Sequence, residues 1–132
     1  KINDVLFTKD GTVGKSLVFN QNVDVVILSS IAIIRPSENL DSYFLHYTFQ
    51  SEAINKFIAK YLGGTAIKRI VLKNLEKFFF PLPSIPEQQQ IASILSNTDE
   101  KIQSYQRYKE KLQRLKKSLM QKLLTGEVRV AV

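Results

Sequence analysis

Two short glycine-containing segments carry the residues best suited to contact a phosphate group. One runs Gly63-Gly64-Thr65-Ala66-Ile67-Lys68-Arg69, and the other runs Lys9-Asp10-Gly11-Thr12-Val13-Gly14-Lys15. In the first, the glycines let backbone approach a ligand closely, Thr65 supplies a hydroxyl, and Lys68 and Arg69 supply charge. An arginine can also reach a guanine edge. The same residues fit an ordinary helix-ending glycine pair followed by a solvated basic strand, and spacing alone leaves both interpretations open.

The second segment ends like a nucleotide-binding phosphate loop but lacks the full pattern of one. That pattern requires a glycine five residues before Gly14, where this chain has Lys9, and a helix afterwards, whereas strand-forming residues follow Lys15. Asp10-Gly11 instead favours a tight hairpin turn, because glycine reaches positive φ without steric cost. We therefore predict a hairpin, with Lys9 and Lys15 able to contact a phosphate from its two ends.

The sequence does not indicate a catalytic or metal site. His46 is the single histidine and lies among apolar and aromatic residues, which indicates a position on a helix face. Zinc sites and catalytic triads both require several convergent side chains, and the acids here are scattered, mostly near lysines. A glycine-rich dinucleotide fingerprint is also missing. We predict a non-catalytic chain that needs no cofactor.

The charge balance favours a polyanionic partner. The chain has 132 residues, with 19 Lys and Arg against 12 Asp and Glu, a formal net charge of +7. Such an excess suits DNA, because neutralising phosphates releases condensed counterions, although a well-solvated basic surface has the same composition. The absence of Cys fits a reducing, cytoplasmic setting. The sequence has no apolar run near the roughly 20 residues of a bilayer span, so we expect no membrane partner.

The first 83 residues are expected to form an α+β domain. Apolar and β-branched runs predict strands at 4–8, 15–20, 23–28 and 29–35 and a closing strand at 78–80. The near-continuous apolar content of 23–35 suggests burial on both faces. Because the chain starts at Lys1 rather than Met and enters a strand-like segment at once, we expect it to be cut from a longer protein.

Helical spacing and capping residues predict two helices between these strands. Asn39 or Asp41 can cap one that runs through Phe49, and Ser51 can cap a second that runs through Tyr61. The Gly63-Gly64 pair would end the second helix, and residues 73–76 suggest a single helical turn.

A third of the chain is predicted to be one long helix. Ser84 and Glu87 form a capping box, and Pro86 falls in the first turn, where its missing N–H does no harm. Residues 85–125 then contain no Gly and no Pro other than Pro86, and Gly126 is placed to end the helix in the left-handed conformation. At 1.5 Å per residue this helix would be roughly 60 Å long.

An apolar stripe along the helix predicts a partner helix. Positions 91, 98, 105, 112 and 119 follow a seven-residue step, which favours a left-handed coiled coil. Lys101 and Lys122 interrupt the seam. A terminal helix packed on its own domain is the alternative, but an isolated helix needs its stripe buried and this one is long. The predicted interface residues are Ile91, Leu95, Ile102, Leu112, Leu115, Leu119 and Leu123.

Taken in order, several segments resemble the specificity subunit of type I restriction-modification systems. They are Asp4 to Lys15, Ile31 to Pro36, Gly64 to Lys68, the Pro81-Leu82-Pro83-Ser84-Ile85-Pro86-Glu87-Gln88-Gln89 junction, and the helix ending Leu123-Leu124-Thr125-Gly126. The junction and its long helix are specific to this family, while the other segments are weak signals on their own.

The resemblance implies a division of the chain and a set of partners. Subunits of this family have two target-recognition domains, each reading half of a bipartite DNA site and each followed by a long helix. The two helices pack antiparallel as a spacer and dock the modification (methyltransferase) subunits. Residues 1–83 would then be part of one recognition domain, and residues 84–132 a spacer helix with a short tail. A chain end just past the helix favours the second of the two domains.

We therefore predict a non-catalytic DNA-recognition subunit. Its partners would be double-stranded DNA, the modification subunit, the restriction subunit in the full complex, and a second spacer helix supplied by another chain or by self-association. The alternative is a coiled-coil protein–protein interaction module without DNA contact. A DNA methyltransferase fragment is disfavoured, because its cofactor-binding and amino-group-binding motifs are missing. The predicted DNA-contacting residues are Lys9, Lys15, Arg35, Thr65, Lys68 and Arg69.

Overall fold

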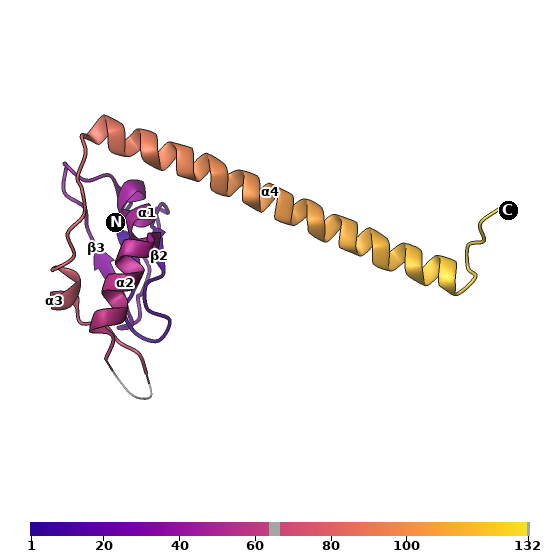
Figure 1. The fold of residues 1–132 in the computed structure, drawn as a ribbon, viewed down its shortest axis with the longest axis horizontal. Helices are drawn as coiled ribbons and strands as arrows, with labels where there is room; N and C mark the ends of the chain where they lie inside the picture. The colour runs from indigo at the N-terminus through magenta and orange to yellow at the C-terminus, as the bar shows by residue number, and fades with distance from the viewer. Residues whose placement is uncertain (64–66, 132) are drawn as a thin grey trace. The chain divides into compact units, whose positions relative to one another are not determined.

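The computed structural model describes residues 1–63 and 67–131 and divides into two compact units, Lys1–Ser93 and Ile94–Val132. The first unit combines a small sheet with short helices, and the second consists of the greater part of a long helix with its tail (Figure 1). This is the predicted α+β class with one long helix at the end. The boundary between the two compact units lies inside that helix, and the predicted division into domains at residue 83 stays a prediction.

A three-stranded antiparallel sheet forms the centre of the first unit. Strand β1 (Val5–Thr8) lies between β2 (Ser16–Val18) and β3 (Ile31–Ile34). The turn from β1 to β2 is the predicted hairpin, with Gly11 and Gly14 at φ values of 76° and 99°. A side chain at Gly14 would also meet Ile58, because an added Cβ would lie 3.3 Å from its Cδ1 atom. The turn is therefore packed against a helix as well as bent.

Both predicted caps start helices in the first unit. Helix α1 (Ser42–Gln50) begins after Asp41, whose carboxylate accepts hydrogen bonds from the N–H groups of Tyr43 and Phe44, each at 2.9 Å. Helix α2 (Glu52–Tyr61) begins after Ser51, whose hydroxyl accepts from the Ile54 N–H. The single turn α3 (Leu72–Leu75) lies within one residue of its predicted place. The capping side chains therefore predicted correctly where these two helices start.

The core lies between one face of the sheet and the helices. Phe7 on β1 and Phe49 on α1 pack with ring centroids 4.9 Å apart, and Phe7 is fully buried. Alternation along β1 places every second side chain in this layer. The buried residues of this core are Val5, Phe7, Val18, Ala32, Leu45, Phe49, Ile54, Ile58, Ile70 and Leu75.

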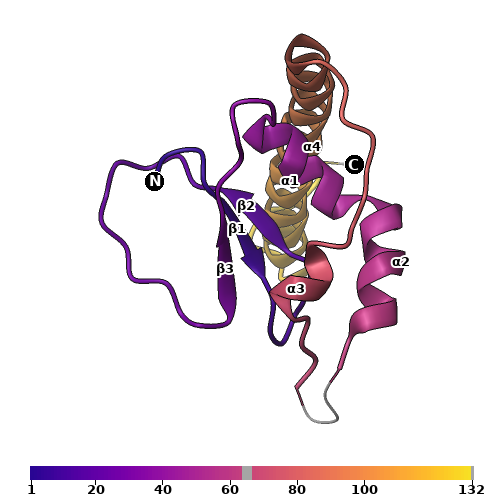
Figure 2. The ribbon, with the colours of Figure 1, turned by 90° about the vertical axis from the view of Figure 1, so that its left-hand side faces the viewer.

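The predicted strand at 23–28 is wrong. This segment runs as a wide irregular loop between β2 and β3 (Figure 2), and Val26 is fully exposed. Its apolar residues were expected to be buried on both faces. Val23, Val25 and Ile27 instead border an open hollow of about 640 Å³ over the outer face of the sheet, together with Leu6 and Ile33. A strand requires a hydrogen-bonded neighbour, and the sheet consists of β2, β1 and β3 without a place for residues 23–28.

The predicted closing strand at 78–80 is also wrong, although its alternation is real. Phe78 and Phe80 point inward and stack on each other at 5.8 Å, while Phe79 is 90% exposed. The segment has the two-residue period of extended chain. It packs through rings, with Phe78 on Phe57 at 5.2 Å and Phe80 on Phe44 at 6.3 Å, rather than through a ladder of backbone hydrogen bonds.

Helix α4 (Ile85–Leu124) has 40 residues and begins and ends where the sequence predicts. Pro86 is its second residue, and the carbonyl of Ser84 accepts the first helical hydrogen bond from the Gln88 N–H at 2.9 Å. Gly126 ends the helix at a φ of 76°. Within the described residues, no helix is both long and apolar enough to cross a membrane.

One buried glutamine attaches the start of α4 to the first unit. Gln88 is fully buried, and its Oε1 accepts a hydrogen bond from the Asp41 N–H at 2.8 Å. Its Nε2 donates to the carbonyl oxygens of Asn39 at 3.0 Å and Pro83 at 2.8 Å. A buried amide whose donors and acceptor are all used specifies one geometry, because any other would leave polar groups unpaired.

We predict that Gln88→Glu destabilises the first unit. The carboxylate would lack the two N–H donors and would face the carbonyl oxygens of Asn39 and Pro83. The expected loss in the free energy of unfolding is roughly 1–3 kcal/mol near neutral pH, measured by chemical denaturation. Gln90→Glu is the control, since Gln90 is exposed on the same helix and the charge change is identical. Equal losses in both variants would contradict the proposed role of Gln88.

Candidate nucleic-acid interface

The two glycine-containing segments meet, although they are far apart in the sequence. The Gly11 N–H donates to the Lys68 carbonyl at 2.8 Å, and the Ile70 N–H donates to the Lys9 carbonyl at 2.9 Å. These bonds flank an antiparallel bridge between Asp10 and Arg69. The β1–β2 turn is therefore paired through its backbone with the chain that leads towards α3.

The carboxylate of Asp10 lies between two of the predicted cations. Its Oδ1 atom accepts from Arg69 Nε at 2.7 Å, and its Oδ2 atom accepts from Lys9 Nζ at 3.0 Å. These two hydrogen bonds, that of Lys9 first, hold the pKa of Asp10 below its usual value, so the group is ionised near neutral pH. The Asp10 side chain is 13% exposed, against 64% for that of Arg69.

Two further predicted lysines flank this group. Lys68 is exposed, and its carbonyl takes part in the pairing with Gly11. Lys15 is exposed at the other end of the turn, where its carbonyl accepts from the Thr8 N–H at 2.9 Å. The structure thus brings Lys9, Lys68 and Arg69 together and places Lys15 on the same turn. Thr65, also predicted, lies outside the described residues.

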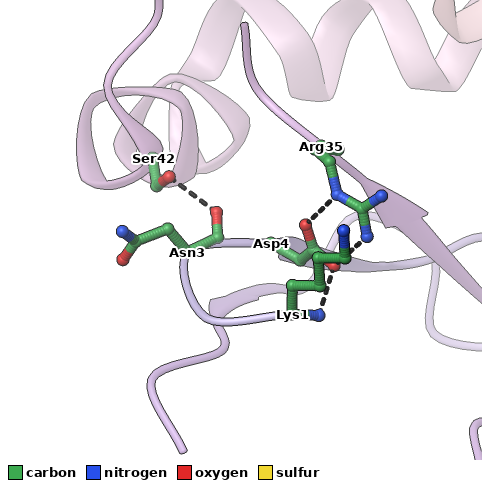
Figure 3. Close-up of polar contacts among 5 residues, drawn as sticks. All are labelled: Lys1, Asn3, Asp4, Arg35 and Ser42. Carbon is green, nitrogen blue, oxygen red and sulfur yellow. Dashed lines mark hydrogen bonds and ion pairs between the residues drawn. The ribbon is translucent and has the colours of Figure 1, made fainter. Parts of the chain in front are cut away.

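Arg35 is not part of this group. Thr8 pairs with Ile31 and Val5 pairs with Ile34, so Arg35 follows β3 at the end of the sheet opposite to the turn. Its Nε and Nη2 atoms donate to both carboxylate oxygens of Asp4 at 2.8 and 2.7 Å (Figure 3). Asp4 is buried, and the Arg35 hydrogen bonds hold its pKa far below the usual range. This pairing competes with the predicted DNA contact, which stays a prediction.

The same close-up shows how the start of β1 is fixed. The α-amino group of Lys1 lies 2.6 Å from the second oxygen of Asp4, and the Ser42 hydroxyl donates to the Asn3 carbonyl at 2.6 Å (Figure 3). The first residue of α1 is thereby tied to the residue that leads into β1. This end of the sheet is a structural junction.

His46 has structural contacts, as its sequence context predicts. Its Nδ1 lies 2.9 Å from the Ser16 hydroxyl and its Nε2 lies 2.7 Å from the Gln50 side-chain nitrogen. The Ser16 contact ties α1 to β2, while the Gln50 contact lies within α1. Among the described residues, no group of three or more His, Cys, Asp or Glu side chains is placed to hold a metal ion.

Sequence reasoning missed two residues that organise the first unit. Asp10 was interpreted only as part of a turn signal, and Gln88 only as one letter of a junction motif. A carboxylate next to Lys9 in a turn that ends at Lys15 was the available signal for Asp10. For Gln88 the signal was a run of three glutamines at a helix start, of which only this one is buried.

The second unit presents the predicted apolar stripe to solvent. Ile91 belongs to the first unit and is partly buried there. The others, from Leu95 onward, keep between 38% and 55% of their surface exposed. They are Leu95, Ile102, Leu112, Leu115, Leu119 and Leu123. An apolar stripe of this length left open on a helix is typical of a coiled-coil surface.

Comparison with known proteins places this arrangement in a family. The family model described as the type I restriction modification DNA specificity domain matches residues 1–114. This chain belongs to that family. The sequence-based resemblance is therefore confirmed, over a region that includes the sheet, both glycine-containing segments and most of α4.

The sequence of this chain is similar to those of named specificity subunits. The type I restriction enzyme MjaVIII specificity subunit of Methanocaldococcus jannaschii is 38% identical over 97 residues, which cover 71% of this chain and 22% of the relative. The type I restriction enzyme EcoBI specificity subunit of Escherichia coli is 32% identical over 90 residues, covering 67% and 19%. The chain thus spans about a fifth of the length of these relatives.

A solved structure shares the fold. It concerns complex assembly and conformational transition of the type I R-M system, and one of its chains matches with a TM-score of 0.70 at 24% sequence identity. The match covers 92% of this chain and 30% of that one. The specificity-domain fold thus includes the small sheet, the short helices and the long helix.

We predict that Arg35→Gln lowers stability in a pH-dependent way. The folded pKa of Asp4 is depressed, so the stabilisation from its ion pair with Arg35 is present above the unfolded pKa, about 3.9, and is lost as the pH falls further. The variant should therefore unfold at lower denaturant than wild type near pH 7, and the gap should begin to narrow below about pH 4 and shrink progressively as the pH falls further. A gap that does not change with pH would contradict this role of the pair.

Proposed function

We propose that this chain is the DNA-recognition part of a type I restriction-modification specificity subunit, acts in the cytoplasm and is non-catalytic. Residues 1–83 would form part of a target-recognition domain, and residues 84–132 its spacer helix and tail. The observation that carries the proposal is the pairing of the two glycine-containing segments. It gathers cations from residues 9–15 and 67–70 at one end of the sheet.

The charge of this group suits double-stranded DNA. Four cations accompany a single carboxylate, and Lys15, Lys68 and Arg69 are all exposed. Phosphate contacts made by such residues fix the position of a protein on the duplex, while an arginine can also read a base edge. The small irregular loops at the ends of a rigid sheet are a common place for binding residues.

The long helix supports the second half of the proposal. Its 40 residues give a rod of roughly 60 Å, which can hold two recognition sites at a fixed separation if a second helix packs against it. The exposed stripe supplies the surface for that helix, contributed by another chain or by a second copy of this one. In the full complex, the modification and restriction subunits would complete the assembly.

The exposed apolar stripe also fits an alternative function, that of a protein-only interaction module. Such a module would use the stripe for coiled-coil pairing without contacting DNA. Retention of the full chain on immobilised duplex DNA at low and high salt separates the two functions. DNA recognition predicts retention at low salt and release at high salt. A protein-only module predicts no retention at either.

We predict that Lys15→Gln and Lys68→Gln each weaken DNA binding and flatten its salt dependence. Removing one phosphate contact should reduce the slope of log K against log salt by about 0.9. Lys56→Gln is the control, because Lys56 pairs with Glu52 on α2 and lies outside the group. Binding titrations on one duplex at several salt concentrations give the slopes. Slopes equal to that of the control would remove both lysines from the interface.

We predict that self-association depends on the stripe. Leu112→Asp combined with Leu115→Asp should yield monomers at concentrations where the wild-type chain associates, because two charges would enter the buried seam. Gln103→Asp combined with Gln121→Asp is the control. It adds the same charge, but on the opposite side of the helix, because each residue turns the helix by about 100° and both glutamines lie nine residues from Leu112. Light-scattering mass against concentration is the measurement, and an unchanged mass in the leucine variant would contradict the prediction.

A further inference from the structure

The carboxylate of Asp10 is costly in a site meant only to attract phosphates. It lies 3.0 Å from Lys9 Nζ and 2.7 Å from Arg69 Nε, and it is ionised near neutral pH. A negative charge among four cations weakens the attraction of each for a phosphate. A site that gains only from net positive charge would do better with a neutral residue at this position.

What Asp10 supplies instead is direction. The carboxylate engages the Nε–H of Arg69, while the terminal nitrogens of Arg69 make no hydrogen bond within the described residues. An arginine held at Nε keeps its planar guanidinium in one orientation, and its remaining N–H groups can still form a two-donor contact. The backbone bridge between Asp10 and Arg69 fixes the main chain on both sides of this pair.

Asp10 weakens the attraction of the site for phosphates but fixes the orientation of the Arg69 guanidinium. The site therefore fits base reading better than phosphate binding. A two-donor contact from arginine to the O6 and N7 atoms of guanine is the geometry that needs a fixed guanidinium plane. A phosphate oxygen accepts donors over a wider range of directions, and the flexible Lys15 and Lys68 side chains suffice for it.

We propose that Asp10 is a positioning residue for specificity. It orients Arg69 to read a guanine and does not itself contact the base. The inference rests on the proposed DNA-recognition function and deepens it. It assigns the phosphate contacts to Lys15 and Lys68 and the sequence-reading contact to Arg69.

The first experiment compares Asp10→Asn with wild type in the full chain. A duplex library with a randomised central segment is selected on the wild-type chain, and the enriched duplex and a scrambled duplex serve as probes. Asp10→Asn should bind the scrambled duplex more tightly, because a negative charge is removed. Its preference for the enriched duplex over the scrambled one should fall by roughly 10-fold or more, the worth of a two-donor base contact.

Asp24→Asn is the matched control. Asp24 is exposed in the loop between β2 and β3, and the substitution changes net charge by the same amount. It should keep the preference of the wild type. Denaturation curves establish whether both variants fold. If Asp10→Asn does not fold, Asp10→Glu, which keeps the charge, replaces it.

The second experiment tests whether Asp10 acts through Arg69. Arg69→Lys keeps the charge but loses the planar fork, so it should lower the preference while leaving the salt dependence unchanged. In that background Asp10→Asn should cause no further loss of preference. A further loss would mean that Asp10 accepts a hydrogen bond from a base directly, for example from a cytosine amino group, and would overturn the positioning role.

The outcomes separate this inference from the proposed function. If the wild-type chain binds DNA with the expected salt dependence but Asp10→Asn keeps its full preference, the positioning role fails and the DNA-binding function stands. The same conclusion follows if the wild-type chain binds DNA yet enriches no sequence. If the wild-type chain does not bind duplex DNA at low salt, both fail. Loss of preference at the same base pair in Asp10→Asn and Arg69→Lys supports the inference.

Discussion

The pairing between the β1–β2 turn and residues 67–70 is the constraint on which the candidate interface depends. Three connections make it: the Gly11 to Lys68 and Ile70 to Lys9 backbone hydrogen bonds and the Asp10 to Arg69 ion pair. The ion pair joins positions 59 residues apart, so closing the chain between them costs conformational entropy that the core must offset. Buried Ile70 follows directly after Arg69 and anchors the segment in that core. Without this pairing, the cations would belong to two separate loops.

A second polar contact, that of Gln88, connects the first unit to the start of its helix. The two contacts share a physical principle. Each is a polar group of low exposure with at least one hydrogen bond to a segment distant in sequence. Each therefore selects one arrangement over others that hydrophobic burial alone would permit. Apolar residues such as Phe7 and Phe49 provide cohesion with less directional preference. In this small unit, packing of the aromatic rings provides stability, and the hydrogen bonds of the buried amide and carboxylate fix how the segments are positioned against each other.

The sequence predicted local structure well and long-range pairing poorly. Caps at Asp41 and Ser51, the hairpin glycines and the stop at Gly126 were all predictable, because each acts through hydrogen bonds or φ values within a few residues. Segments 23–28 and 78–80 have strand composition but no ladder, since strand formation depends on an available neighbour that composition does not reveal. The meeting of Asp10 with Arg69 is equally non-local. The candidate cations could therefore be picked out from the sequence by residue type, but only the structure shows that they lie close together.

The two units must obtain their stability from different sources. The first buries Val5, Phe7, Ile54 and Ile70 almost completely within itself, so its folding need not depend on concentration. The helix from Ile94 onward leaves its stripe exposed, and a single helix gains little from propensity, because helical stability in proteins comes mainly from packing of an apolar face. Burial of that stripe against another helix would therefore couple helix formation to association. If the first unit carries the recognition residues as proposed, these residues could vary without disturbing assembly, since folding of the first unit and pairing of the helix depend on separate sets of contacts.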